Sequence, residues 1–160
     1  MRSIKLFVVK EGTLYSDSFL DLKVKLLYPG YGEYGNIPFY GCVLFLAGTD
    51  TRVGSIVLRI GEMMASKEYY YDCHIGYHID EEFRGRGFAV RACRLVSEVA
   101  KLHDITEIFI TCNDQNAGSI RVIEKLGAQY LETIVIPEEY LDEHDQSNKR
   151  HRYKWILENR

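Results

Sequence analysis

The spacing of apolar residues changes part-way along this chain, and this change limits the folds that the chain can adopt. Over residues 20–26, apolar side chains alternate with Asp21, Lys23 and Lys25, which indicates a half-buried strand. Over residues 88–103 they recur instead every three or four positions, which is typical of an amphipathic helix. A strand-rich first part followed by a long helix predicts a sheet with helices packed against it.

The rest of the chain can be divided in the same way. Further strands are predicted over 4–9, 39–47, 53–60, 69–79, 108–112, 130–136 and 153–157, and a second helix over 117–126 that Gly127 ends in the left-handed conformation. Residues 48–51 form a predicted hairpin connection and residues 28–38 a loop. Alternation along 69–79 would set Tyr70 on the opposite strand face from Tyr69 and Tyr71. We expect one domain, residues 1–160, of class α/β or mixed α+β with a partly parallel central sheet.

Charge and composition exclude several classes of protein. Lys and Arg number 20 and Asp and Glu 23, a net charge of −3 that offers no general attraction to nucleic acid or to an anionic membrane. The longest apolar run, residues 42–47, is far shorter than the roughly 20 residues of a membrane-spanning helix. Cys42, Cys73, Cys93 and Cys112 lack the paired spacing of zinc sites and are expected to be buried, reduced thiols. We therefore expect a cytoplasmic protein without a metal site.

A glycine-rich basic turn leads into the long helix and is the most informative motif. It consists of Arg84, Gly85, Arg86 and Gly87. Because a helix start carries unpaired N–H groups and the positive end of the helix dipole, such a turn favours phosphate; the alternative is an ordinary turn with solvated arginines. The chain contains no GxxxxGK[ST] motif, and Val90 stands where GxGxxG requires its third glycine. Neither of these two nucleotide-binding motifs fits.

A third motif does fit the same turn. Arg84, Gly87 and Ala89 match Q/R-x-x-G-x-G/A, and from about residue 69 to 157 the chain resembles the GNAT N-acetyltransferase superfamily. The likeness extends to the strand that ends at Ile79 and to Asn116, which stands ahead of the second helix. It implies acetyl-CoA as the cofactor and a GNAT-like sheet whose central strands splay apart. Before residue 69 the family usually has one or two helices, whereas this sequence has strand patterns.

The resemblance also implies a cofactor site. Backbone N–H groups of residues 85–90 would hold the pyrophosphate, and the pantetheine arm would run beside residues 77–79. A backbone N–H near Ile79 would polarise the thioester carbonyl. Asn116 would contact the arm from the other side; its alternative role is that of a helix N-cap. The implied cofactor-binding residues are Tyr77, His78, Ile79, Arg84, Gly85, Arg86, Gly87, Phe88, Ala89, Val90, Asn116 and Ser119.

The proton-transfer residues of the family are not present. Ile123 replaces the tyrosine that protonates the leaving thiolate in many members, and Thr111 replaces the glutamate base of some ribosomal-protein N-acetyltransferases. Ser119 is therefore the candidate acid; its alternative is an ordinary serine in the first turn of a helix. His78 is the candidate base and Glu62 a second one, whereas a water relay would need neither.

These features give one leading hypothesis and two alternatives. The leading one is an acetyl-CoA-dependent N-acetyltransferase that acts, as a monomer or homodimer, on a primary amine of a small molecule or a peptide N-terminus. The acidic stretch 138–145 would attract a cationic amine if it borders the acceptor cleft; otherwise it is a solvated loop. Ile123 and Thr111 motivate an alternative, a CoA-binding module with little catalytic activity. A nucleic-acid-binding domain, which the net charge disfavours, would use Arg84, Arg86, Arg91 and Arg94.

Overall fold

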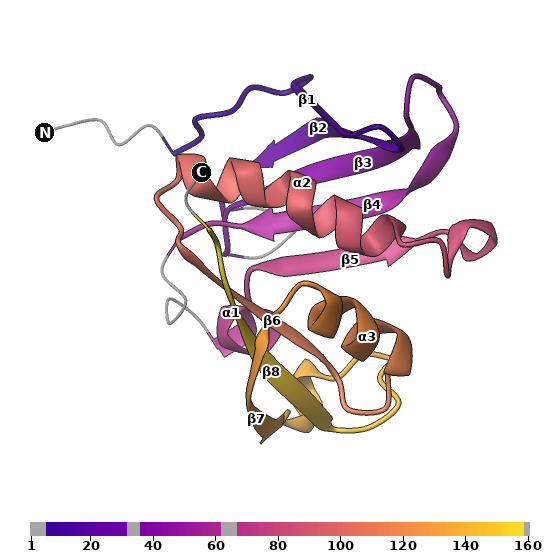
Figure 1. The fold of residues 1–160 in the computed structure, drawn as a ribbon. Helices are drawn as coiled ribbons and strands as arrows, with labels where there is room; N and C mark the ends of the chain where they lie inside the picture. Colours follow the sequence, from indigo (N-terminus) through magenta and orange to yellow (C-terminus); the bar gives the residue numbers. More distant parts are fainter. Residues whose placement is uncertain (1–5, 32–35, 62–66, 159–160) are drawn as a thin grey trace, which may run out of the picture.

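The computed structural model of the chain describes residues 6–31, 36–61 and 67–158. Its elements are β1 Leu14–Ser16, β2 Leu20–Tyr28, β3 Phe39–Leu46, β4 Arg52–Arg59, α1 Lys67–Asp72, β5 Ile75–Ile79, α2 Phe88–Leu102, β6 Glu107–Asn113, α3 Ala117–Lys125, β7 Gln129–Val135 and β8 Lys149–Ile156 (Figure 1). Short 3₁₀ turns cover Glu81–Phe83 and Glu138–Tyr140. None of the described helices combines the length and the apolar character that crossing a bilayer requires.

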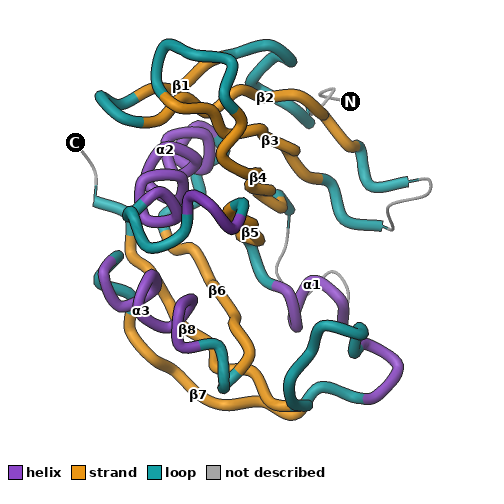
Figure 2. Tube along the Cα trace, turned by 90° about the vertical axis from the view of Figure 1, so that its right-hand side faces the viewer, coloured by secondary structure: helices purple, strands orange, loops and turns teal. Residues whose placement is uncertain are grey.

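The strands form two sheets. Over the described residues the first has the order β1-β2-β3-β4-β5 and the second β6-β8-β7, and every ladder is antiparallel. The α/β class is confirmed, but the prediction of a partly parallel sheet is wrong. β5 and β6, the strands at the junction of the two sheets, form no ladder in this part of the chain, because they meet near the start of β5 and then diverge (Figures 1 and 2).

The two sheets are fastened together where the chain enters β5. Cys73 forms an isolated antiparallel bridge with Ile110. The N–H of His74 donates to the carbonyl oxygen of Phe109 at 3.0 Å, and the N–H of Phe109 donates to His74 Nδ1 at 2.9 Å. The strands are therefore held at one end and leave an open wedge at the other.

The core lies between the first sheet and α2, which crosses one face of that sheet (Figure 1). The apolar stripe that predicted this helix is its buried face: Ala92, Cys93, Val96, Val99 and Ala100 are fully buried. Burial of each of the two valines on this face stabilises the fold by about 1.5–3 kcal/mol. α3 lies against α2 and β6. The predicted hairpin of β3 and β4, the second helix, the left-handed Gly127 at φ 77° and the four buried, free cysteines are confirmed.

Two predicted strands are wrong. Residues 69–79 are not one extended run, because α1 ends at Asp72 and Cys73 turns the chain in a left-handed conformation (φ 59°) before β5 begins. The alternation proposed for Tyr70 and its neighbours therefore does not apply.

Residues 6–9 form no strand: the N–H groups of Val8 and Val9 donate to the hydroxyl of Tyr40 at 3.0 and 3.2 Å. Residues 4 and 5 of that prediction lie outside the described residues.

Candidate functional site

The start of α2 is open to bind an anion. Gly85 and Gly87 have φ values of 76° and 80°, which glycine adopts without strain, and a Cβ at either position would meet no atom within 4 Å. No side chain of the described residues caps the helix at Gly87. The N–H groups of the first turn thus have no intrahelical acceptor, and the positive end of the helix dipole faces open space. This geometry suits a phosphate group.

This helix start borders a cleft of about 630 Å³, called here the helix cleft. Its other walls are the end of β5 and one face of α3. Almost all of the residues that the sequence analysis assigned to a cofactor come together here, namely Tyr77, His78, Ile79, Arg84, Gly85, Gly87, Phe88, Ala89, Val90, Asn116 and Ser119. The exception is Arg86, whose guanidinium lies 5.6 Å from the centre of the Phe83 ring.

Sequence reasoning found only part of the α3 side of the helix cleft, because it assigned Asn116 and Ser119 to the cofactor but none of four other residues there. Gly118, Arg121, Val122 and Lys125 line it. Gly118 and Val122 are four residues apart, as are Arg121 and Lys125, which is the spacing of one helical face, so this signal was present in the sequence. Two cations thus face the start of α2 across the helix cleft. Arg84 differs from these two cations, because its Nε donates to the carbonyl oxygen of Ile79 at 2.8 Å. This hydrogen bond connects the glycine turn to the end of β5.

The backbone of β5 has hydrogen-bonding groups available on the side away from β4. Asp80 N–H donates to the carbonyl oxygen of Val53 at 2.8 Å, and the β4–β5 register is regular. In an antiparallel strand the backbone N–H and C=O groups of every second residue bond to the same neighbouring strand. Because Asp80 bonds to the β4 side, the N–H groups of Tyr77 and Ile79 point away from β4. They face the wedge between β5 and β6, where an extended ligand with amide groups could pair with them as a further strand.

Two hydroxyl groups meet at the inner end of the helix cleft. The Tyr77 hydroxyl donates to Ser119 Oγ at 3.1 Å. Burial raises the pKa of Tyr77 to about 12, so this phenol stays protonated and remains a donor at neutral pH. Asn116 is the N-cap of α3, and its Oδ1 accepts the N–H of Ser119 at 3.0 Å. The alternative role considered for Asn116 is thus observed, and the cap fixes the position of Ser119.

A second space, the polar cavity, adjoins the helix cleft at these hydroxyls. It has a volume of about 400 Å³ and shares Tyr77, Asn116 and Ser119 with the helix cleft. Its remaining walls come from segments that are far apart in the sequence: Arg59, Asp72, Ile75, Gly76, Thr111, Cys112, Asn113, Asp142, His144, Asp145 and Arg150. Part of the acidic stretch 138–145 therefore borders a cavity.

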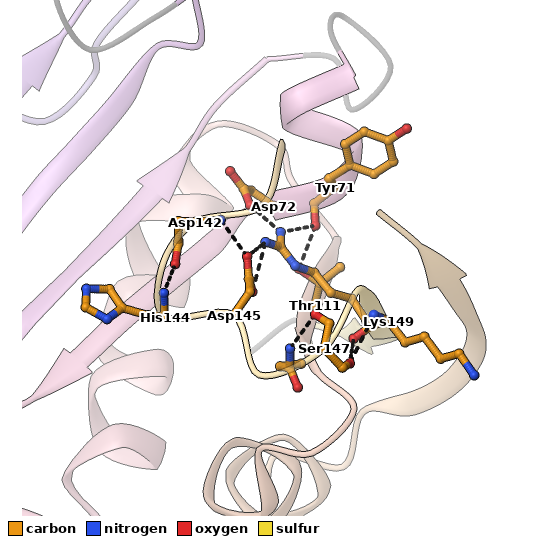
Figure 3. Close-up of polar contacts among 10 residues, drawn as sticks. Tyr71, Asp72, Thr111, Asp142, His144, Asp145, Ser147 and Lys149 are labelled. Carbon is orange, nitrogen blue, oxygen red and sulfur yellow. Dashed lines mark hydrogen bonds and ion pairs between the residues drawn. The ribbon is translucent and has the colours of Figure 1, made fainter. Parts of the chain in front are cut away.

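An ion-pair network holds the acidic loop beside the polar cavity. Arg150 lies 2.7 Å from Asp72 Oδ1 and 3.2 Å from Asp145 Oδ2, and its side chain is only 11% exposed. The N–H of Asp142 also donates to Asp145 Oδ2, at 3.0 Å. Figure 3 shows Asp72 and Asp145 facing each other, with Asp142 and His144 along the loop. Asp72 and Arg150 were missed by sequence reasoning, since 78 residues separate them and no local pattern relates them.

The candidate bases occupy different places. His78 lines the helix cleft but not the polar cavity, and its exposed imidazole lies 3.7 Å from Asp80. Glu62 lies outside the described residues. Burial lowers the pKa of His74 to about 4, and its Nδ1 is occupied by the N–H of Phe109. The groups on the wall of the polar cavity that can accept a proton include Asp142 and His144.

Comparison with known proteins assigns the family. A family model described as "Acetyltransferase (GNAT) domain" matches residues 25–129, more than half of the chain. This chain belongs to the GNAT acetyltransferase family. Acetyl-CoA is the cofactor of that family, and the open helix start, its facing cations and the unpaired β5 groups fit such a cofactor. Comparison with curated protein sequences finds no significant match.

Solved structures share the fold of this GNAT chain. One is an acetyltransferase from Salmonella typhimurium that modifies the N-terminal serine of ribosomal protein L7/L12, with TM-score 0.58, 20% identity, and 75% of this chain and 64% of that chain covered. Another is a ribosomal-protein-S5-alanine acetyltransferase from Vibrio fischeri, with TM-score 0.66, 12% identity and coverage of 92% and 98%. RimJ from Mycobacterium smegmatis, in complex with CoA-disulfide, gives TM-score 0.58, 18% identity and coverage of 74% and 53%. At these identities the likeness shows the fold alone, and this chain spans less than two thirds of the Salmonella protein.

Proposed function

We propose that this chain is an acetyl-CoA-dependent N-acetyltransferase that transfers the acetyl group directly to a primary amine. The observation that carries the proposal is the meeting of the helix cleft and the polar cavity at Tyr77 and Ser119. Two ligands that bind in the two spaces would come together at this point. One space has the groups that hold phosphates and amides, and the other has carboxylates that suit a cation.

Acetyl-CoA binding would use the backbone more than the side chains. The N–H groups at the start of α2 would hold the pyrophosphate, with Arg121 and Lys125 supplying charge from the facing helix. The amides of the pantetheine arm would pair with the backbone of Tyr77 and Ile79. The arm would then place the thioester beside the two hydroxyl groups.

Acetyl transfer would proceed by attack of the neutral amine on the thioester carbonyl carbon. A C–N bond forms, the carbonyl oxygen gains negative charge that an N–H on the open side of β5 can stabilise, and the C–S bond then breaks. Because the Tyr77 hydroxyl donates to Ser119 Oγ, the hydrogen of Ser119 is free to pass to the leaving thiolate, so Ser119 acts as the acid. Ser119 Oγ regains a proton from solvent at the polar cavity, which returns the site to its starting state. The amine loses its proton toward Asp142, His144 or water at the polar cavity.

A direct transfer is also supported by Cys112, the cysteine on the wall of the polar cavity. Burial raises the pKa of its thiol to about 11, so it is protonated at neutral pH. Since the thiolate is the nucleophilic form of cysteine, Cys112 is a poor candidate for an acetyl-enzyme intermediate.

The acceptor is a cationic primary amine before it loses its proton. The wall of the polar cavity carries three carboxylates, those of Asp72, Asp142 and Asp145, and two guanidinium groups, those of Arg59 and Arg150. Because Arg150 already pairs with Asp72 and Asp145, the negative field for a cation comes mainly from Asp142 and from the exposed acidic residues of the loop. Either a small amine or a peptide N-terminus meets this requirement. The names of the Salmonella and Vibrio fischeri structures, which specify ribosomal proteins, make peptide N-termini the first acceptors to test.

A CoA-binding module with little activity is the second candidate. It is favoured by the two positions where the family's proton-transfer residues are replaced. Ile123 is completely buried and cannot donate a proton, and the Thr111 hydroxyl donates to the carbonyl oxygen of Tyr71 at 2.8 Å. The Ile123 side chain thus packs in the core, and the Thr111 hydroxyl is taken up by a backbone hydrogen bond. This candidate differs from the first only in whether Ser119 completes the chemistry.

Calorimetric titration with acetyl-CoA, followed by thiol-release assays with small amines and peptide N-termini, tests the proposal. We expect acetyl-CoA to bind with one site per chain and at least one amine to accelerate thiol release. Binding without acceleration by any amine would establish the second candidate instead. A chain that does not bind acetyl-CoA would contradict both.

A further inference from the structure

Arg59 lines the polar cavity and has no carboxylate partner among the described residues. It is the last residue of β4, and its backbone N–H donates to the carbonyl oxygen of His74 at 2.7 Å, which fixes its position beside β5. Its guanidinium donates from Nη1 to the carbonyl oxygen of Cys73 at 3.3 Å. Because a guanidinium has several further N–H donors in a planar fork, Arg59 can bind an anion that enters the cavity.

The other arginine of the polar cavity is engaged by the protein itself. Arg150 pairs with Asp72 and with Asp145, so these three charges largely compensate one another. Asp142 is exposed and, within the part of the chain that the structure describes, forms no ion pair. An uncompensated cation, Arg59, and an uncompensated anion, Asp142, thus line the same cavity.

The guanidinium of Arg59 lies beside Gly76. A Cβ at Gly76 would stand 3.6 Å from Nη1 and 3.7 Å from Nη2 of Arg59. Gly76 does not have a left-handed φ, so its backbone conformation does not require glycine, and the missing side chain leaves room next to the guanidinium. Tyr77 is the next residue, and consecutive Cα atoms lie about 3.8 Å apart. An anion bound to Arg59 would therefore be close to the place proposed for the thioester.

We propose that Arg59 binds a carboxylate of the acceptor, so that the acceptor is a primary amine with a carboxylate a few bonds from its nitrogen. This inference rests on the proposed acetyl transfer and specifies the substrate class. The ammonium group would approach Asp142, and the carboxylate would bind the guanidinium through two parallel hydrogen bonds. An amine without an anionic group would instead bring a second cation to Arg59.

A carboxylate suits these charges better than a phosphate does. One uncompensated guanidinium balances a single negative charge, whereas a phosphate group carries about −1.5 to −2 and would meet the carboxylates of the acidic loop. The short distance from Gly76 to Tyr77 requires the carboxylate and the amine to be close together. A free amino acid meets this requirement, and so does a peptide that begins with an aspartate.

Pairs of acceptors that differ only in the carboxylate test the assignment. Glycine and glycinamide form one pair, and two tripeptides that begin with aspartate or asparagine form the other. Since the amines of a pair differ in basicity, the quantity to compare is the acid-to-amide ratio of kcat/KM, measured by thiol release. We expect Arg59→Met to lower this ratio about 10–100-fold for at least one pair, the range for a lost charge-assisted hydrogen bond, and to raise kcat/KM for the amide. The pair that responds distinguishes a free amino acid from a peptide.

Arg94→Met is the matched control, because it removes an exposed guanidinium on α2 that does not line the polar cavity. It should leave the acid-to-amide ratio unchanged. If Arg59→Met also left the ratio unchanged for both pairs, or lowered kcat/KM equally for acid and amide, the proposal would be overturned.

Calorimetric titration of the same acceptors into the chain with bound CoA provides a measurement without catalysis. The acid of the responding pair should bind at least tenfold more weakly to Arg59→Met than to the wild type. Equal binding to both chains, or no binding to the wild type, would overturn the role of Arg59. If no amine accelerates thiol release, the proposed acetyl transfer fails, and this titration still decides whether Arg59 binds a carboxylate.

Discussion

The helix cleft and the polar cavity lie side by side, yet they are built in different ways. The helix cleft consists mainly of backbone groups and helix faces within residues 77–90 and 116–125, whereas side chains from Arg59 to Arg150 contribute to the polar cavity. A site made of backbone leaves a local pattern of glycines and helical spacing in the sequence. A site made of distant side chains leaves no such pattern. The two halves should therefore respond differently to substitution.

The largest expected effect is at the point where the two spaces meet. Ser119→Ala should lower kcat about 10²–10⁴-fold, the range for loss of a general acid, while the affinity for acetyl-CoA stays unchanged. Tyr77→Phe should lower kcat by a smaller factor, because it removes only the hydrogen bond to Ser119 Oγ. Steady-state kinetics and calorimetric titration measure the two quantities separately.

Combining the two substitutions provides the control. If the hydroxyls act as one unit, the double variant should be no slower than Ser119→Ala, since the role of Tyr77 depends on Ser119. Wild-type turnover of Ser119→Ala would show instead that water protonates the leaving thiolate.

The second largest effect concerns the polar cavity. Arg150→Met leaves Asp145, 12% exposed, and Asp72 without their cation. We expect the free energy of unfolding to fall by about 2–3 kcal/mol and the KM of the amine to rise, because the acidic loop is no longer held in place. Urea denaturation and acceptor titrations measure these changes.

Arg121→Met on the helix cleft is the matched comparison for Arg150→Met. Its side chain is exposed, so we expect little change in stability and a decrease in acetyl-CoA affinity equivalent to about 1 kcal/mol or less. The contrast between the two spaces would fail if Arg150→Met mainly weakened acetyl-CoA binding and Arg121→Met mainly raised the KM of the amine.

The third prediction concerns the junction on which both spaces depend. Burial holds the pKa of His74 at about 4, compared with 6.5 for an ordinary histidine. Between these pH values the unfolded chain binds the proton and the folded chain does not, so the free energy of unfolding falls as the pH drops. The loss should reach about 2 kcal/mol between pH 7 and pH 5.

The variant His74→Asn keeps a hydrogen-bond acceptor for Phe109 but does not titrate, so it should show a flatter pH dependence in urea denaturation. The comparison isolates His74 from His103, whose pKa burial also lowers. An equally steep dependence in the variant would assign the acid sensitivity to other groups.

Apart from the Arg121→Met comparison, the smallest effect is that of one Cβ in the helix cleft. Gly87→Val should weaken acetyl-CoA binding at least tenfold, about 1.4 kcal/mol, because the side chain would enter the space where a phosphate approaches. Gly127→Val is the control: Gly127 has a similar φ of 77° and also an open Cβ direction, but it does not line the helix cleft. It should cost comparable stability and leave acetyl-CoA affinity unchanged. Equal affinities of the two variants would contradict the phosphate assignment.

The sequence predicted those parts of the molecule that local patterns determine. α2 and its glycine turn could be recognised because the apolar spacing and the residues that start the helix are adjacent in the chain. The turn at Cys73 could not, since tyrosines at 69–71 favour a strand and the turn depends on contacts with Ile110 and Phe109 from β6. The pairing of Asp72 with Arg150 likewise depends on the completed fold.

The wall formed by Tyr77 and Ser119 has a thermodynamic consequence for the two ligands. In the proposed function each ligand would contact the same two hydroxyl groups, which line both spaces, so a shift of these groups by one ligand would change the surface that the other meets. Linkage then requires reciprocity: the factor by which acetyl-CoA changes the affinity for the amine equals the factor by which the amine changes the affinity for acetyl-CoA. The hydrogen bond of 3.1 Å between Tyr77 and Ser119 would thus couple the occupancy of one space to that of the other.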